Sequence, residues 1–173
     1  LIVSPYDEGE LQKIEVMLGS HPIPSQMSID AATALSEMMG ECSEDDLYIY
    51  LLSGGSSSLM ELPVSPINLS ELQETTALML HNNLEIHEIN CVRKHLSKVK
   101  GGRLAQMCKA QGVVLVVSDI IDDDLHSVGS APLYADTSTF EQAKEILESK
   151  NLFQIIPDSV KSVLQKGLDG EIE

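Results

Sequence analysis

Two short stretches decide the fold class: residues 47–53 read LYIYLLS and residues 113–119 read VVLVVSD. Both are aliphatic runs of strand length, which indicates buried β-strands. Shorter apolar runs at residues 1–4 and 13–18 predict two further strands. Longer segments of helical period separate the runs. This alternation is typical of a mainly parallel sheet covered by helices, so we expect an α/β fold.

Helix-start patterns support the same fold class. SIDAATALSEMMGE, residues 28–41, opens with a capping candidate, and SELQETTALMLHNN, residues 70–83, opens with a serine and a glutamine in capping-box spacing. STFEQAKEILESK, residues 138–150, repeats this pattern, and PDSVKSVLQKG, residues 157–167, places a proline at a helix start. We therefore expect four helices in these segments. The length favours one domain over residues 1–168, followed by an acidic tail at residues 169–173.

Charge and cysteine content narrow the function classes. The chain carries 27 acidic side chains against 11 Lys and Arg, a formal net charge of −16. Its long-range field repels phosphate polymers and anionic membranes, so we expect no nucleic-acid and no membrane partner. Three cysteines without metal-binding spacing indicate reduced thiols and a cytoplasmic location. No apolar run reaches the ~18 residues of a membrane span.

The basic segment NCVRKHLSKVKGGRLA, residues 90–105, holds five of the eleven cations. Helical spacing predicts an apolar stripe formed by Ile89, Val92, Leu96 and Val99. A neighbouring face would carry hydrogen-bond donors: Asn90, Arg93, Ser97 and Lys100. Lys94 and Lys98 would point further toward solvent, and Gly101 and Gly102 would end the helix. Such donors bind phosphate or carboxylate, although a solvated helix neutralised by nearby acids is the alternative.

A glycine loop follows the strand at residues 47–53. In SGGSSSL, Gly54 and Gly55 allow backbone amides to approach an anion closely, with Ser53, Ser56 and Ser57 beside them. The loop lacks the Gly-Lys-Ser/Thr of a Walker motif and the GxGxxG of dinucleotide sites. A tight turn after a strand is the plainer alternative.

An acidic loop follows the strand at residues 113–119. Ser118 and Asp119 end that strand, at the edge where α/β sheets place their sites. Asp122, Asp123 and Asp124 follow, and grouped carboxylates suit Mg²⁺. Solvated turn aspartates are the alternative, favoured for Asp122 and Asp124. The scattered histidines, including His21, read more readily as hydrogen-bonded structural residues than as general bases.

Taken in order, these motifs resemble the MOFRL-type glycerate 2-kinase family, whose members are often labelled hydroxypyruvate reductases. The resemblance covers residues 1–168 and rests on four stretches: SHPIP, SGGSSSL, IHEINCVRKHLSKVKGGRLA and SDIIDDDLHSVGSAPLYAD. The third is long and specific. It implies a Rossmann-like three-layer α/β/α fold and phosphoryl transfer from ATP to the 2-hydroxyl of D-glycerate, with Mg²⁺ present.

The resemblance also implies site residues. Arg93, Lys100 and Asp119 would be catalytic, and Asp119, Asp123 and Asp124 would bind the metal. The substrate and phosphate would be bound by a larger set: Ser53, Gly54, Gly55, Ser56, Ser57, Asn90, Lys94, Gly101, Gly102 and Ser118.

The chain departs from the family pattern at Ser56, which replaces a third loop glycine, at Ser130–Leu133 and at Asp122. The family's Gly-Lys-Ala motif and its C-terminal MOFRL domain are absent from these 173 residues. Two other functions therefore stay open: a noncatalytic anion-binding or regulatory module, and an NAD(P)H-dependent hydroxypyruvate reductase. The sequence leaves homo-oligomer formation open as well.

Overall fold

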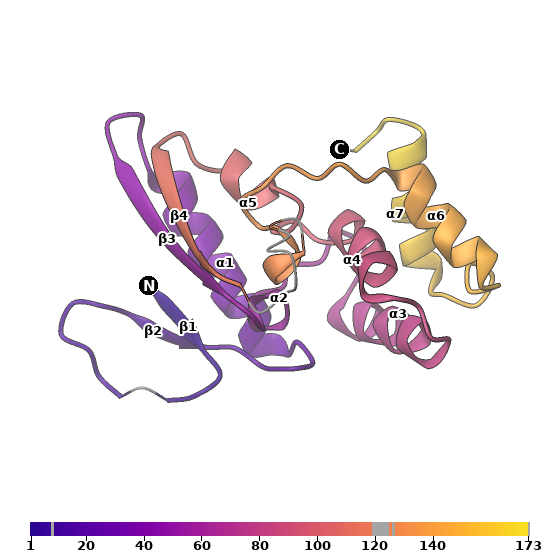
Figure 1. The fold of residues 1–173 in the computed structure, drawn as a ribbon, viewed down its shortest axis with the longest axis horizontal. Helices are drawn as coiled ribbons and strands as arrows, with labels where there is room; N and C mark the ends of the chain where they lie inside the picture. Colours follow the sequence, from indigo (N-terminus) through magenta and orange to yellow (C-terminus); the bar gives the residue numbers. More distant parts are fainter. Residues whose placement is uncertain (8, 119–124, 126, 173) are drawn as a thin grey trace. The chain divides into compact units, whose positions relative to one another are not determined.

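The computed structural model describes residues 1–7, 9–118, 125 and 127–172, and groups them into two compact units (Figure 1). Unit 1 comprises Leu1–Leu62 and Val99–Ala135, and unit 2 comprises Pro63–Lys98 and Asp136–Glu173. The chain passes from unit 1 to unit 2 and back before it finishes in unit 2. The expected single domain over residues 1–168 stays a prediction.

Unit 1 contains all four predicted strands. β1 (Ile2–Ser4) pairs in parallel with β2 (Val16–Leu18), and β3 (Leu47–Ser53) pairs in parallel with β4 (Gln111–Val117). The second pair is in register from Leu47 opposite Gln111 to Ser53 opposite Val117. The α/β class with parallel strands is therefore confirmed. Among the described residues the strands form two separate two-stranded sheets.

One face of the β3–β4 pair packs on the core, and the other is exposed. Tyr48 and Tyr50 pack against the hydrophobic cluster of unit 1. Ile49, Leu51 and Leu115 point the other way and are 65%, 75% and 55% exposed. The prediction that both strands are buried is thus wrong for this face. Side chains alternate across a strand, and the described residues cover only one side of this pair.

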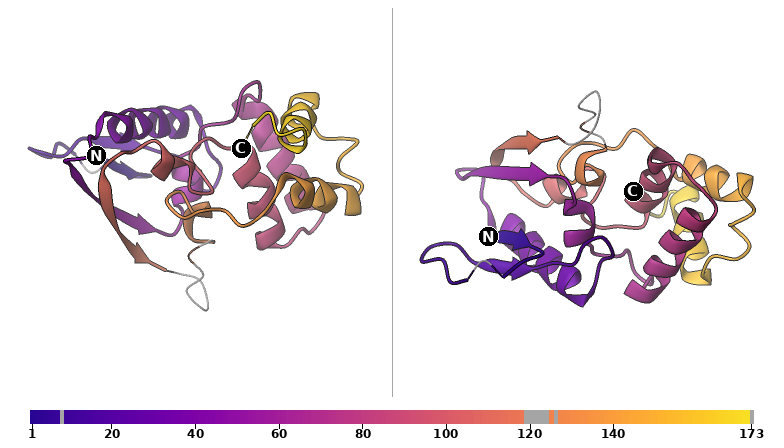
Figure 2. Two further views of the ribbon diagram at one scale, coloured as in Figure 1. Left: turned by 90° about the horizontal axis from the view of Figure 1, so that it is seen from above. Right: turned by 60° about the horizontal axis from the view of Figure 1, so that its bottom comes forward.

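Helix α1 (Gln26–Glu41) supplies half of the buried cluster on the covered side, and Figure 2 shows it running beside β3 and β4. Its capping box joins Ser25 and Ser28, so Ser28 lies inside the first turn and is not the N-cap that the sequence predicts. Short helices α2 (Ser56–Leu59) and α5 (Arg103–Gln106) and a 3₁₀ turn, η2 (Val128–Ser130), complete unit 1. The buried cluster is formed by Ala32, Leu35, Met39, Met60, Val99 and Leu104.

Unit 2 is helical in its described residues. Helices α3 (Leu69–His81), α4 (Ile86–His95), α6 (Phe140–Ser149) and α7 (Asp158–Leu168) pack in the pairs α4–α6, α6–α7, α3–α4 and α3–α7. Their shared core includes Leu72, Val92, Leu96, Leu147 and Leu164, each at most 1% exposed. No helix in the described ranges is both long and apolar enough to cross a membrane.

Helices α3 and α6 both begin with a capping box, as the sequence predicts. The box of α3 begins earlier in the chain than predicted, and the box of α6 begins later. In α3 the Asn68 side chain accepts from the Glu71 amide at 3.0 Å, and the Glu71 carboxylate accepts from the Asn68 amide at 2.9 Å. This box begins two residues before the predicted Ser70. In α6 the N-cap is Thr139, one residue after the predicted Ser138.

Candidate functional site

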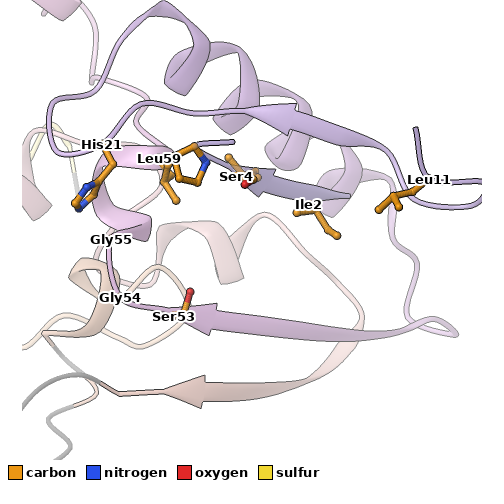
Figure 3. Close-up of a pocket in the computed structure, with 10 residues that line it drawn as sticks. Ile2, Ser4, Leu11, His21, Ser53, Gly54, Gly55 and Leu59 are labelled. Atoms are coloured by element: carbon orange, nitrogen blue, oxygen red, sulfur yellow. The ribbon is translucent and has the colours of Figure 1, made fainter. Parts of the chain in front are cut away.

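A cavity of about 790 Å³ opens in unit 1 at the carboxyl ends of β1 and β3 (Figure 3). Ser4 comes from the end of β1, Ser53 from the end of β3, and Gly54 and Gly55 from the loop that follows. His21 comes from the loop between β2 and α1. Polar side chains and exposed backbone thus meet at the strand edge where α/β proteins place ligands.

The diglycine loop lies directly against His21. Gly55 has φ +82°, and a Cβ atom built at Gly55 would come within 3.1 Å of the His21 ring. Glycine is therefore required both for the backbone conformation and for the imidazole beside it. The two sequence interpretations, an anion cradle and a tight turn, both fit this geometry. The loop forms a turn, and that turn lines the cavity.

The next two serines contact η2 and are not among the residues that line the cavity. Ser56 and Ser57 begin α2. The Ser57 hydroxyl forms a 2.8 Å hydrogen bond with the Ser130 hydroxyl. The Ser56 hydroxyl is buried against Gly129, whose bare Cα leaves room for it. Their predicted contact with substrate stays a prediction, and in this structure both serines hold α2 against η2.

Lys100 lies inside unit 1 with an acidic partner. Its side chain is 2% exposed, and its ammonium donates to the Glu61 carboxylate at 2.8 Å and to the Met60 carbonyl at 3.1 Å. Glu61 is fully buried. This ion pair fixes the chain after α2, so any role of Lys100 in binding substrate has to be compatible with it.

The two glycines after Lys100 bond to the segment around η2. The Gly101 amide donates to the Ser130 carbonyl at 3.1 Å, and the Gly102 amide donates to the Ala131 carbonyl at 2.8 Å. Gly102 has φ +85° and is the N-cap of α5. Both amides therefore have backbone partners, and their assignment to phosphate binding stays a prediction.

The basic segment is a shorter helix than its sequence pattern predicts. Helix α4 ends at His95, because the Leu96 carbonyl accepts from the Val64 amide at 2.9 Å and Ser97 bridges Pro63. The chain therefore leaves the helix five residues before the expected end at Lys100. This exit also divides the basic segment, with Asn90, Arg93 and Lys94 in unit 2 and Lys100, Gly101 and Gly102 in unit 1.

Lys94 does not point to solvent, contrary to the sequence interpretation. Its side chain is 8% exposed, and its ammonium contacts the Asp136 carboxylate at 3.3 Å. Burial alone would raise the pKa of the Asp136 carboxyl, but hydrogen bonds from Ser138 and the Lys94 charge lower it below its ordinary value. Asn90 is also buried in unit 2, and Arg93 is half-buried.

The predicted metal site cannot be built from the described residues. Ser118 is half-buried directly after β4, but Asp119, Asp123 and Asp124 lie outside the described part of the chain. Within that part, no group of three or more His, Cys, Asp or Glu side chains could hold a metal ion. Magnesium binding by this loop stays a prediction.

Seven of the residues that line the cavity were not placed in the site by the sequence interpretation: Ile2, Val3, Ser4, Pro5, Leu11, His21 and Leu59. Ser4 and Leu11 carry no recognisable signal, since both belong to ordinary strand and loop sequence. His21 does have one, because it stands in SHPIP, one of the four stretches on which the resemblance rests.

Known proteins match this chain in sequence over most of its length. Residues 1–165 match the family described as "Domain of unknown function (DUF4147)". A glycerate 2-kinase from Pyrococcus horikoshii is 45% identical over 99% of this chain, and a D-glycerate 2-kinase from Thermotoga maritima is 40% identical over 86% of it. These matches span 39% and 36% of the two relatives.

Solved structures agree with the sequence matches. A crystal structure of a Pyrococcus horikoshii OT3 protein superposes with a TM-score of 0.92 at 45% identity, covering 95% of this chain and 38% of that one. A Thermotoga maritima glycerate kinase superposes with a TM-score of 0.87 at 39% identity, covering 94% and 39%. The chain thus spans about two fifths of the length of these proteins. It belongs to the DUF4147 family, within the MOFRL-type glycerate 2-kinase family that its motifs resemble.

Proposed function

We propose that the cavity of unit 1 is part of the substrate site of a glycerate 2-kinase, in which ATP phosphorylates the 2-hydroxyl of D-glycerate. The observation that carries the proposal is the meeting of Ser4, His21 and the loop Ser53–Gly54–Gly55 around one cavity. The relatives named glycerate 2-kinase support the choice of reaction.

The cavity suits an anionic ligand for chemical reasons. Phosphoryl transfer depends on positioning the phosphoryl group and compensating its charge, which hydrogen-bond donors supply. The His21 imidazole and the Ser53 hydroxyl are donors at the cavity wall. Gly54 and Gly55 let a phosphate or carboxylate oxygen approach the backbone. In a chain of net charge −16, such local donors are the means by which an anion is held.

ATP and Mg²⁺ belong to this proposal, with their ligands taken from the sequence. Asp119, Asp123 and Asp124 would hold Mg²⁺, since grouped carboxylate oxygens are the ligands it prefers. When bound, the ion would offset the charge of the transferring phosphoryl group. Ser118, the described residue next to this loop, is half-buried at the end of β4.

The surroundings of Arg93 and of Lys100 support different roles for these two cationic residues. Arg93 is half-buried on α4, which leaves part of its surface at solvent for contact with an anion. Lys100 already pairs with Glu61, so we propose that it acts by holding the chain beside α2 in place. On this view Lys100 is a positioning residue.

Calorimetric titration of the 173-residue chain with D-glycerate and with ATP–Mg²⁺, together with an ADP-coupled assay, tests the proposal. Gly55→Ala fills the space beside His21 and should weaken binding of both anions at least ~10-fold. Gly170→Ala is the matched control, because Gly170 also has positive φ (+71°) but no atom within 4 Å of its Cβ position. If the two substitutions weaken binding equally, the cavity is not part of the substrate site.

The same assay separates the alternatives. Binding without ADP formation would favour a noncatalytic anion-binding module. An Agrobacterium vitis relative with a hydroxypyruvate reductase name, 37% identical over 90% of this chain, makes NADH oxidation with hydroxypyruvate a necessary control. Turnover in that reaction without ADP formation would overturn the kinase proposal.

A further inference from the structure

Three consecutive residues at η2 have a left-handed backbone conformation. Gly129, Ser130 and Ala131 have φ values of +59°, +60° and +53°. Glycine takes this conformation freely, but Ser130 and Ala131 carry a Cβ atom and are strained in it. Strain of this kind persists only where the surrounding structure fixes the backbone, and it is concentrated at functional sites. The fold thus holds this left-handed segment, residues 129–131, against its local preference.

Burial and backbone hydrogen bonds hold the left-handed segment in place. Ser130 is 1% exposed, and Ala131 is fully buried. The Ser130 carbonyl accepts from the Gly101 amide at 3.1 Å, and the Ala131 carbonyl accepts from the Gly102 amide at 2.8 Å. The Ala131 amide donates to the Val128 carbonyl at 2.9 Å. Relaxation of the strained backbone would break these buried bonds, so the segment is a rigid support.

The left-handed segment also contacts the start of α2. The Ser130 hydroxyl forms a 2.8 Å hydrogen bond with the Ser57 hydroxyl. The Cα atom of Gly129 lies so close to the Ser56 hydroxyl that a Cβ atom at residue 129 would collide with it. Ser56 and Ser57 directly follow Gly55, which lines the cavity. The support therefore contacts the chain immediately after the cavity loop.

The position of α2 determines the position of the cavity loop. Gly55 is the N-cap of α2, and its carbonyl accepts from the Ser58 amide at 3.1 Å. A shift of α2 would therefore move Gly55 relative to the His21 ring, which lies 3.1 Å from the Cβ position of Gly55. Helix α2 has only four residues, and a helix this short depends on tertiary contacts for its stability. The hydrogen bond between Ser57 and Ser130 is such a contact.

We propose that Ser130 is a positioning residue of the cavity, which acts through the Ser57 hydroxyl on the loop Ser53–Gly54–Gly55. The proposal rests on the proposed function, in which this loop contacts an anionic substrate. The strained backbone places the Ser130 hydroxyl at the start of α2 before a ligand arrives. A loop that is already held in its binding conformation loses less conformational entropy when an anion binds, and affinity rises accordingly.

Nuclear magnetic resonance of the 173-residue chain tests the positioning without a ligand. Ser130→Ala removes the hydroxyl, and Ser130→Gly removes it while also relieving the backbone strain, so the second variant stays informative if the first is unstable. Both should shift the amide signals of Gly54 and Gly55. Ser36→Ala is the matched control in unit 1, because its hydroxyl bonds only within α1, to the Ala32 carbonyl at 2.7 Å, and it should leave these signals in place. Unchanged Gly54 and Gly55 signals in both Ser130 variants would overturn the proposal, whether or not the chain binds glycerate.

Calorimetric titration with ATP–Mg²⁺ and with D-glycerate measures the effect on binding, at a temperature at which every variant is folded. Ser130→Ala should weaken binding about 3- to 10-fold, which corresponds to the loss of one neutral hydrogen bond. A merely structural role would lower the unfolding free energy and leave this Kd unchanged. Ser36→Ala should bind as the original chain does.

The double variant Ser57→Ala, Ser130→Ala shows whether the two hydroxyls act as a pair. Its binding should be no weaker than that of the weaker-binding single variant, because either substitution already breaks the shared bond. Additive losses, or an unchanged Kd for Ser130→Ala, would contradict the proposal. If the original chain binds neither ligand, the proposed function is wrong, and the amide signals of Gly54 and Gly55 alone decide whether Ser130 positions the loop.

Discussion

The buried Lys100–Glu61 ion pair gives the sharpest test of how unit 1 is held together. Both side chains are almost fully buried, and the ammonium and carboxylate are 2.8 Å apart. Lys100→Met removes the charge and keeps the length of the side chain. It leaves the Glu61 carboxylate buried without its cation and the Met60 carbonyl without its donor. Breaking a buried pair in this way costs about 3–5 kcal/mol of unfolding free energy.

Replacing both partners should behave differently. Lys100→Met combined with Glu61→Leu leaves no buried charge, and such exchanges are commonly neutral or stabilising. We therefore expect the double variant to recover most of the loss, which makes the coupling between the two substitutions several kcal/mol. A domain of this size is stable by only about 5–15 kcal/mol, so the single variant should lose a large fraction of it.

Tyrosine fluorescence during urea unfolding measures this effect in unit 1 alone. The chain has no Trp, and its four tyrosines (Tyr6, Tyr48, Tyr50 and Tyr134) all lie in unit 1. Lys94→Met, which breaks the Lys94–Asp136 pair of unit 2, is the matched control. A change below about 0.5 kcal/mol for Lys100→Met would refute the reasoning. If the double variant folds but no longer binds ATP–Mg²⁺, Lys100 contacts the anion directly and is more than a positioning residue.

Two further predictions concern unit 2 and the turn after Lys100. The pKa of Asp136 is lowered, so its ionised form stabilises unit 2 above about pH 4 and this contribution is lost as the pH falls through the folded-state pKa. Circular dichroism melts between about pH 2 and 5 should show the melting temperature falling as the pH falls, and Asp136→Asn should make this fall shallower. Gly102→Ala should cost unit 1 roughly 1–3 kcal/mol, because φ is +85° and the new Cβ would lie 2.9 Å from a backbone carbonyl oxygen. Gly9→Ala, with φ +71° and open space in unit 1, should cost less in the same urea titration.

The strands could be predicted from the sequence because aliphatic runs of strand length carry a strong local signal. What the sequence could not show is which face is covered. Tyr48 and Ile49 are neighbours, yet the first packs on the core and the second is 65% exposed. Coverage depends on elements elsewhere in the chain, and LYIYLLS contains no charged residue that would mark its outer face.

Helix starts were predictable in kind but not in position. Ser, Thr and Asn recur at adjacent sites near each start, and several have a suitable partner three residues later. Asn68 caps α3 in place of Ser70, because local pairing rules allow both and tertiary packing selects one. The Gly54–Gly55 loop was predictable as part of a site, since it follows a strand directly. The position of Ser4 in the site could not be predicted, because the neighbouring sequence does not distinguish Ser4 from the last residue of any other strand.

The cation cluster shows why charge patterns in a sequence do not by themselves locate a ligand. Lys94 and Lys100 are close in the chain, but their partners Asp136 and Glu61 are 42 and 39 residues away. With 27 acidic residues against 11 Lys and Arg, an internal acid is available to almost any cation that becomes buried. Burial then favours pairing, because an unpaired ammonium in the interior would lose its hydration without compensation. Clustered cations in an acidic chain therefore indicate where two segments are joined at least as well as where a phosphate binds. The case for anion binding in this molecule accordingly depends on the cavity beside Gly55 and His21.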